Sequence, residues 1–395
     1  MLSCLPWQEL ILSSKQNLSV QILNIISIVL LICYSGILLF FIKGWWALKN
    51  GQPLQSQFKT TVSVLVPVRN EEQHIANLIQ DLIAQNYPIT LFNIIIIDDH
   101  STDQTATIVR SFSNSNLRLL QLSIEKPINS YKKRAIATAI ATCDSELILT
   151  TDGDCRMGPD WIASIVSMYE QERCQLISSP VAYHQEKSLA EKIQTVEFEL
   201  LIAAGAACIQ NKFPNTCNGA NLAYTRAAYH AVGGFKGIDD LASGDDELLL
   251  HKMHKQFPDG LRFLKEPSAI VYTEAKGTLR SFYQQRKRWA SKSVKYADKR
   301  MVLLVSIIYF FNLLIFIQAG LLFFTTANLA MFVILIGVKM GLDAILIFQS
   351  LSFFKKRRLL FLLPLVEIFY VIYILIIGII ANIGGAYEWK GRTVN

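Results

Sequence analysis

The chain reads Val-Ser-Val-Leu-Val-Pro-Val-Arg-Asn-Glu-Glu from Val62 to Glu72, and this stretch decides the fold class. Its apolar part, Val62–Val66, is short and uninterrupted, which is typical of a strand covered on both faces. A second such run, Ile94–Ile97, follows a stretch of helical periodicity at Gln73–Gln85. Because strands alternate with helices, we expect an α/β domain with a mainly parallel sheet over residues 58–273.

Long apolar blocks flank this domain. The block Gln21–Ile42 has about the 20 apolar residues that a helix needs to cross a membrane. It runs into Lys43 and Trp45 rather than into a small-residue cleavage site, so we expect a retained anchor within residues 1–57. Three further blocks and a short tail fill residues 301–395, and the blocks are Val302–Thr325, Ala327–Leu351 and Leu359–Ile383. The sequence therefore predicts one N-terminal and about three C-terminal transmembrane helices.

The basic residues indicate the orientation of the chain. The net charge is +7, and Lys and Arg gather beside the apolar blocks, where they suit anionic headgroups or the cytosolic side better than nucleic acid. Four spans would place Lys43, Lys49, Lys355–Arg358 and the α/β domain in the cytosol and both termini outside. The tail residues Trp389, Lys390 and Arg392 would instead suit a cytosolic interface. We thus expect a multi-pass integral membrane protein with no nucleic-acid partner.

The seven cysteines form no CxxC pair, so we expect buried thiols rather than a zinc module or a disulfide framework.

Acidic residues follow the predicted strands. Asp98 and Asp99 follow the second strand, and Asp152-Gly153-Asp154 follows a third run, Glu146–Thr150. Ligands of open α/β sheets bind at the carboxyl ends of the strands. A carboxylate there can accept hydrogen bonds from ribose or a base, whereas the Asp-Gly-Asp turn suits Mg²⁺ or Mn²⁺ with a bound diphosphate. The alternative is that these acids, like Glu71 after the first strand, only cap turns and helices.

A third acidic group, Gly244-Asp245-Asp246, opens a helical run. A carboxylate in this position could act as a general base toward a hydroxyl nucleophile. Acids at a helix start also complement the helix dipole, which is the structural alternative. His251 and His254 follow at a spacing of three, and surface positions suit them better than metal ligation.

A basic and aromatic segment, residues 274–300, follows the α/β domain. From Lys276 to Arg300 it holds nine Lys or Arg residues and one acid, Asp298. Such a segment suits a membrane interface, and its arginines can also hold a diphosphate.

Five motifs in this order resemble those of the inverting family 2 glycosyltransferases, which have the Rossmann-like GT-A fold. They are the Val-Pro-x-Arg-Asn-Glu-Glu opening, Asp98-Asp99, Asp152-x-Asp154, Gly244-Asp245-Asp246 and Gln285-x-x-Arg288-Trp289. The resemblance covers residues 58–289, and the membrane layout agrees with it.

The resemblance implies a role for each matching residue. Asp246 would be the catalytic base, with Asp245 in the place usually taken by Glu. Asp98 or Asp99 would contact the nucleoside, and a divalent metal, Mg²⁺ or Mn²⁺, would bind Asp152 and Asp154 with the diphosphate. The other matches are Glu71 and Lys132 on the donor side, where Tyr131 replaces the family's glycine, and Gln285, Arg288, Trp289 and Asn221 on the acceptor and diphosphate side.

From these matches we expect transfer of a sugar from a nucleotide-sugar donor, UDP-linked, to a lipid or lipid-linked acceptor at the cytosolic membrane face, for a cell-envelope glycan. Gly-Asp-Asp replaces the Thr-Glu-Asp of many processive synthases, and few spans follow the domain, which favours single addition. A small processive polysaccharide synthase is the alternative, and an inactive membrane scaffold a lesser one. A transporter is suggested only by Lys339, Asp343 and Glu367 within predicted spans, where a structural Lys–Asp pair explains them better.

Overall fold

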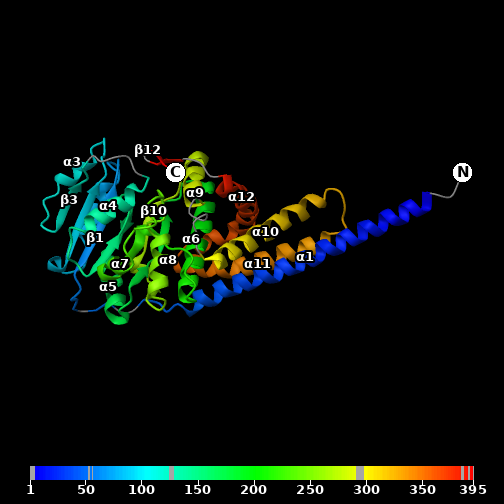
Figure 1. Cartoon of the computed structure of the whole chain (residues 1–395), viewed down its shortest axis with the longest axis horizontal. Helices are drawn as coiled ribbons and strands as arrows, with labels where there is room; N and C mark the ends of the chain where they lie inside the picture. Colours follow the sequence, from blue (N-terminus) through cyan, green and yellow to red (C-terminus); the bar gives the residue numbers. More distant parts are fainter. Residues whose placement is uncertain are drawn as a thin grey trace.

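The computed structural model describes residues 5–51, 54–55, 57–123, 129–290, 298–383, 387–389 and 392–394. An α/β domain occupies one end of the molecule, and long helices extend from it (Figure 1). The expected basic segment is described in part, because residues 291–297 lie outside these ranges, as does Lys390 of the tail.

A seven-stranded sheet forms the centre of the α/β domain, with strand order β3-β2-β1-β4-β8-β6-β9. Strands β3, β2, β1 and β4 are parallel, β8 runs antiparallel to β4 and β6, and β6 pairs in parallel with β9. The predicted mainly parallel sheet is confirmed. The strands are β1 Val62–Val68, β2 Phe92–Asp98, β3 Leu117–Gln121, β4 Leu147–Thr150, β6 Leu176–Ser178, β8 Leu222–Thr225 and β9 Leu261–Phe263.

A small second sheet and a set of helices complete the domain. The small sheet has the order β5-β10-β7, with β5 Arg156–Met157, β7 Val181–His184 and β10 Val271–Glu274. The helices are α2 Ile75–Ile83, α3 Thr105–Arg110, α4 Tyr131–Ile140, α5 Trp161–Glu172, α6 Leu189–Gln210, α7 Arg226–Ala231, α8 Glu247–Gln256 and α9 Leu279–Ala290, with 3₁₀ turns at η1 Ile89–Leu91, η2 Gly219–Asn221 and η3 Pro267–Ala269.

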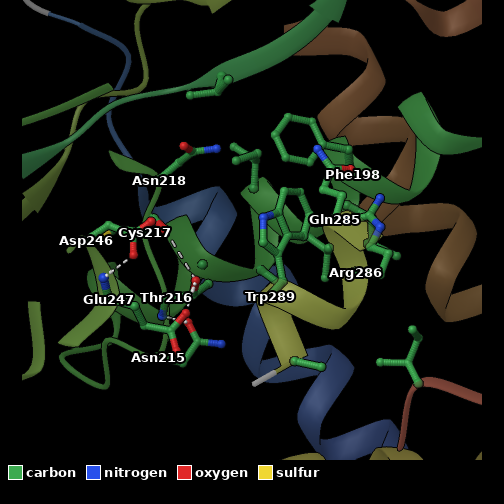
Figure 2. A pocket seen from close by; sticks show the side chains of 18 of the residues that line it. Phe198, Asn215, Thr216, Cys217, Asn218, Asp246, Glu247, Gln285, Arg286 and Trp289 are labelled. Carbon is green, nitrogen blue, oxygen red and sulfur yellow. Dashed lines mark hydrogen bonds between the residues drawn. The ribbon is translucent and has the colours of Figure 1, made fainter. Parts of the chain in front are cut away.

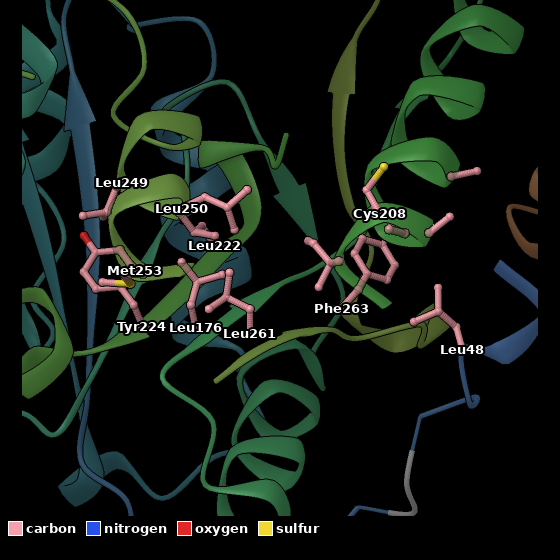
Figure 3. Close-up of a cluster of buried hydrophobic side chains, with 14 of the residues drawn as sticks. Leu48, Leu176, Cys208, Leu222, Tyr224, Leu249, Leu250, Met253, Leu261 and Phe263 are labelled. Atoms are coloured by element: carbon pink, nitrogen blue, oxygen red, sulfur yellow. The ribbon is translucent and has the colours of Figure 1, made fainter. Parts of the chain in front are cut away.

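Alternate residues of the central strands supply two cores, because successive side chains of a strand point to opposite faces. Val64 and Ile96 pack on the face that carries α2 and α5, whereas Leu65 and Ile95 pack on the face that carries α4. The second core runs on through Phe263 and Cys208 toward α1 (Figure 3). This continuous packing fixes the α/β domain against the first membrane helix.

A helix forms at each of the four apolar blocks that were predicted to span the membrane. These helices are α1 Leu5–Ala47, α10 Lys299–Leu321, α11 Leu329–Phe353 and α12 Leu363–Ile383, with a 3₁₀ turn at η5 Arg357–Leu362. A fifth helix, α6, also has the length and composition of a span, but 67% of its most apolar window is buried in the molecule. Helices α1, α10 and α11 extend together from the α/β domain, whereas α12 stays beside α6 and α9 (Figure 1).

Charged side chains within these helices pair with one another. The Lys339 ammonium lies 2.6 Å from Asp343 and also contacts Glu367, and the Tyr34 hydroxyl donates to Asp343 over 2.6 Å. The structural pair expected from the sequence is therefore formed, and it joins α1, α11 and α12.

The path of α12 corrects the predicted position of the tail. Before α12, the Lys356 ammonium lies 2.6 Å from Glu186 and 3.1 Å from Glu199, so this end of the helix is tied to the α/β domain. After α12, a short hairpin of β11 (Tyr387–Trp389) and β12 (Arg392–Val394) brings Arg392 to Asp99, again on the α/β domain. Both ends of α12 thus contact this domain, which favours the alternative of a tail beside the α/β domain over a C-terminus on the opposite side.

Candidate active site

The carboxyl ends of β1, β2 and β4 meet at one edge of the sheet, because the three strands are parallel neighbours. The loop after β1 is tied to the loop after β2: the Arg69 guanidinium donates to the carbonyls of Asp99 and His100 over 2.9 and 2.6 Å. Asn70 has a φ of 54°, and its side chain accepts from the Thr102 N–H over 2.8 Å. The two loops therefore form one rigid wall.

Glu71 supports the Asp-Gly-Asp turn after β4. Its side chain is buried, and its backbone N–H donates to the Thr105 hydroxyl over 2.8 Å. A Cβ at Gly153 would lie 2.9 Å from the Glu71 Cγ and from a Val68 methyl. Only glycine allows this approach, so the turn that carries Asp152 and Asp154 rests directly on the loop after β1.

Asp98 and Asp99 have different surroundings. The two Asp98 oxygens accept from the Ser101 N–H over 3.0 Å and from the Gln121 amide over 3.1 Å. Both Asp98 oxygens are thus hydrogen-bonded within the fold, which favours Asp99 over Asp98 for the predicted nucleoside contact. The Asp99 carboxylate instead faces one histidine and two arginine side chains. Its partners are His100 at 2.9 Å, Arg134 at 3.6 Å and Arg392 at 2.5 Å.

Lys132 joins two of the predicted acidic motifs. Its ammonium lies 2.7 Å from Asp152 and 3.0 Å from Asp245. Burial lowers the pKa of Lys132, but the neighbouring carboxylates outweigh it, so the pKa is raised above its ordinary value. The site therefore keeps a fixed cation between the Asp-Gly-Asp turn and the Gly-Asp-Asp loop.

Lys133, the next residue of α4, was missed by sequence reasoning. It is 1% exposed, and its ammonium donates to the carbonyls of Ile238, Leu241 and Ser243 over 2.6, 2.9 and 2.7 Å. These carbonyls belong to the segment that leads into Gly244-Asp245-Asp246. Lys133 thereby holds the acidic loop in place, and only its position beside Lys132 could have drawn attention to it.

Asp246 directly precedes α8, and its side chain lines the cavity. One oxygen accepts from the Glu247 N–H over 2.7 Å, and the other accepts from the Gly219 N–H over 3.1 Å. The structural alternative, a helix-capping acid, therefore describes Asp246 in part. The Gly219 contact also fixes the carboxylate against the segment 217–220, which lines the same cavity as Asp246.

The donor set fits a divalent metal with few protein ligands. Asp152 and Asp154 flank one glycine and line the same cavity, and carboxylate oxygens are the ligands that Mg²⁺ and Mn²⁺ prefer. Among the described residues no group of three or more His, Cys, Asp or Glu side chains could hold a metal ion. Two carboxylates would leave the rest of the coordination shell to water and phosphate oxygens.

Trp289 points into the cavity between two sets of side chains. Figure 2 shows Asp246 and Asn215–Asn218 on one side of it, and Phe198 and Arg286 on the other. Gln285 and Arg288 line the same cavity, as the sequence predicts. The Arg286 guanidinium, which sequence reasoning missed, lies 4.3 Å from the Trp289 ring centroid and forms a buried ion pair with Glu197. Arg286 therefore packs against the Trp289 ring.

Asn221 does not line the cavity, contrary to the sequence-based expectation. It is fully buried: its amide donates to the carbonyls of Pro180 and Ala269, both over 2.7 Å, and accepts from the Trp161 indole over 2.9 Å. Every polar atom of this side chain is engaged, so Asn221 joins segments of the fold. The neighbours that do line the cavity are Cys217, Asn218, Gly219 and Ala220.

His251, for which the sequence favours a surface position over metal ligation, is half-buried and contacts the protein backbone. Its ring lies 2.9 Å from the Asn215 carbonyl.

One cavity of about 800 Å³ joins the Asp-Gly-Asp turn, Lys132 and the Gly-Asp-Asp loop, and it continues between the long apolar helices. Its polar end holds Lys132, Asp152, Asp154, Asp245 and Asp246. Its other end is lined mainly by apolar residues of α1, α10 and α12, among them Leu38, Phe41, Leu304, Ile308, Ile374 and Ile377, and also by several tyrosines and Asp343. Trp289 also lines this cavity.

The fold defines the class of the protein as GT-A. It resembles the mannosyltransferase PcManGT from Pyrobaculum calidifontis, solved in complex with GDP-Man and Mn²⁺, with a TM-score of 0.55 and 18% identity over 88% of this chain and 99% of that one. Residues 63–232 match the model described as Glycosyl transferase family 2. The chain therefore carries a family 2 glycosyltransferase domain.

Curated relatives agree with this assignment. A probable glycosyltransferase, YdaM, from Bacillus subtilis is 27% identical over 236 residues, which are 58% of this chain and 54% of that protein. A beta-monoglucosyldiacylglycerol synthase from Nostoc is 26% identical over 230 residues, which are 58% of this chain and 48% of that protein. The chain thus spans about half the length of the curated relatives that it matches.

Proposed function

We propose that the protein is an inverting, metal-dependent glycosyltransferase that moves a hexose from a nucleotide-sugar donor to a lipid or lipid-linked acceptor at the cytosolic membrane face. One observation carries this proposal: the cavity that holds the carboxylates continues between α1, α10 and α12. An acceptor with a hydrocarbon chain could place the chain among Leu38, Ile308 and Ile377 and its hydroxyl beside Asp246. The relative that is named beta-monoglucosyldiacylglycerol synthase supports the same acceptor class.

The acidic loop supplies the base. Asp246 takes the proton of the acceptor hydroxyl, whose oxygen attacks the anomeric carbon from the face opposite the diphosphate. The bond between the anomeric carbon and the phosphate oxygen breaks, and the nucleoside diphosphate leaves, so the configuration inverts. Backbone N–H groups of Gly219 and Glu247 fix the Asp246 oxygens during this step.

The cationic side chains act on the leaving group. Lys132 lies between Asp152 and Asp245, where its ammonium can bind the diphosphate as it departs. A divalent ion bound by Asp152 and Asp154 would neutralise negative charge as a Lewis acid. Asp245 would position Lys132.

The lining of the cavity favours a lipid over a growing polysaccharide. A glycan chain carries hydroxyl groups that need hydrogen-bond partners when they leave water. Polar partners are a minority at the helix end of the cavity, where leucine, isoleucine and phenylalanine side chains outnumber the tyrosines and Asp343. The apolar part of the cavity offers the hydrophobic contacts that an acyl or prenyl chain requires. Single addition to a lipid is therefore the favoured outcome.

The test uses the full-length protein in lipid nanodiscs with UDP- and GDP-linked hexoses and two acceptors, diacylglycerol and a polyprenyl phosphate. We expect release of the nucleoside diphosphate together with a lipid that has gained one sugar by mass spectrometry. Release without a glycolipid, or a ladder of sugar additions, would contradict the acceptor assignment.

Two isoleucines of α12 provide a matched pair of variants for the acceptor. Ile377 lines the cavity, whereas Ile376 is 50% exposed on the outer face of the helix. We expect Ile377→Asn to raise the KM for the lipid, with donor affinity unchanged, and Ile376→Asn to have little effect. Equal effects of both variants would contradict a lipid chain in this cavity.

A further inference from the structure

The short hairpin β11–β12 near the end of the chain reaches the predicted nucleoside site. Residues pair within it as Tyr387 with Val394 and Trp389 with Arg392, and β11 packs against α9, which carries Trp289. The Arg392 guanidinium extends to Asp99, which lies 293 residues earlier in the chain. The sequence motifs give this tail no role.

The contacts of Arg392 are those of a planar ligand. One guanidinium nitrogen lies 2.5 Å from Asp99 Oδ2, and the other lies 3.4 Å from Oδ1 and 3.3 Å from the Asp99 carbonyl. The guanidinium carbon lies 3.8 Å from the centroid of the Tyr131 ring, which is a close cation–π distance. Arg392 thus combines N–H donation to a carboxylate with stacking on an aromatic face.

A nucleobase would use the same two groups. It is planar, it can stack on the Tyr131 ring, and the N–H edge of uracil or guanine can donate to the Asp99 carboxylate. Tyr131 directly precedes Lys132, whose ammonium lies 2.7 Å from Asp152 at the diphosphate end of the site. A base on Tyr131 and a diphosphate near Lys132 would therefore be neighbours along one bound nucleotide.

We propose that Arg392 occupies the nucleobase position of the donor site, so that the hairpin is a latch that competes with the nucleotide. The proposal rests on the proposed function and on the nucleoside contact of Asp99 that the family resemblance implies. The Asp99 side chain is 5% exposed and that of Arg392 16% exposed, so little room remains for a base beside the guanidinium. Binding of the donor must break the Arg392–Asp99 ion pair and release the hairpin.

A closed latch raises the apparent Kd of the nucleotide by a factor that can be measured. If it is closed in about nine molecules of ten, the apparent Kd of the nucleotide is raised about tenfold, because only the open fraction binds. Arg392→Ala should therefore bind UDP or GDP, in the presence of Mn²⁺, about tenfold more tightly than the natural chain in calorimetry. Arg392→Lys should fall between the two, because an ammonium keeps the charge but lacks the planar pair of donors. Arg358→Ala, at an exposed site after α11, controls for the lost charge.

Hydrogen exchange of the hairpin amides, residues 387–389 and 392–394, gives a second measurement that needs no nucleotide. We expect faster exchange in Arg392→Ala and in Asp99→Asn than in the natural chain, and faster exchange in the natural chain after UDP or GDP is added. Unchanged exchange in both variants would refute the latch whether or not a nucleotide binds.

Weaker or unchanged nucleotide binding by Arg392→Ala would refute the competition. Failure of the natural chain and of Arg392→Ala to bind either nucleotide would refute the competition and the proposed function together, even if exchange shows that the ion pair holds the hairpin.

Discussion

Replacing Lys133 by methionine should lower kcat about 10- to 100-fold and leave the nucleotide affinity nearly unchanged. Methionine keeps the apolar stem of the side chain but removes the three hydrogen bonds to the carbonyls of Ile238, Leu241 and Ser243. These bonds hold the segment that leads into Asp246. Lys132, the preceding residue of α4, keeps its contact with Asp152. The base is displaced, but the diphosphate site remains.

The magnitude follows from the burial of these bonds. The bonds to Ile238 and Leu241 are partly exposed, so water can replace the ammonium there, and only the bond to Ser243 is fully buried. A hydrogen bond to a charged group contributes about 1.5–3 kcal/mol. Each 1.4 kcal/mol corresponds to about a factor of ten in an equilibrium constant. Loss of this bond therefore lowers the population of the correctly placed loop, relative to displaced loops, by about 10- to 100-fold.

The assay compares Lys133→Met with its neighbour, Lys132→Met. Steady-state kinetics should show a fall in kcat for Lys133→Met, whereas Lys132→Met should mainly weaken nucleoside diphosphate binding in calorimetry. Thermal melting checks that both variants remain folded. A folded Lys133→Met variant with kcat within about twofold of the natural chain would refute the idea that Lys133 positions the base.

The other predictions concern the base, the metal and the tryptophan. Asp246→Asn should lower kcat by about 10²–10⁴-fold with donor affinity retained, and Asp245→Asn should cost less; the reverse order would assign the base to Asp245. Excess chelator should abolish turnover, and Asp154→Asn should weaken the effect of added Mn²⁺ on nucleotide binding; full activity in chelator would exclude a required metal. Arg286→Met should raise the KM for the acceptor and shift the fluorescence of Trp289, because the guanidinium lies 4.3 Å from that ring; unchanged values of both would show that Arg286 does not position Trp289.

The sheet and the grouping of the acids could be predicted from sequence because both follow from local rules. Uninterrupted apolar runs such as Val62–Val66 mark buried strands, and parallel strands bring their carboxyl ends to one edge. That rule alone brings the loops after β1, β2 and β4 together, where Asp99 and Asp152 lie. The local strand pattern is therefore enough to predict that these residues lie at one edge of the sheet.

The supporting residues could not be predicted in this way. Lys133 contacts carbonyls 105–110 residues away, and Arg286 pairs with Glu197 at a separation of 89 residues. No spacing rule links such positions, because the contacts exist only after the helices pack. Asn221 shows the converse, since its motif suggests a ligand contact while packing buries it entirely.

Helix α12 shows why hydropathy alone misplaced the tail. Its exposed side chains, Leu365, Ile368, Ile372, Ile376 and Ile379, recur every three or four residues and form one apolar stripe. A helix lying along the membrane interface needs such a stripe as much as a spanning helix does, so length and apolarity cannot distinguish the two. The distinction comes from polar contacts at its two ends, where Lys356 binds Glu186 and Arg392 binds Asp99. Because both acids belong to the α/β domain, both ends of α12 lie beside this domain, and this path brings Arg392 within reach of Asp99.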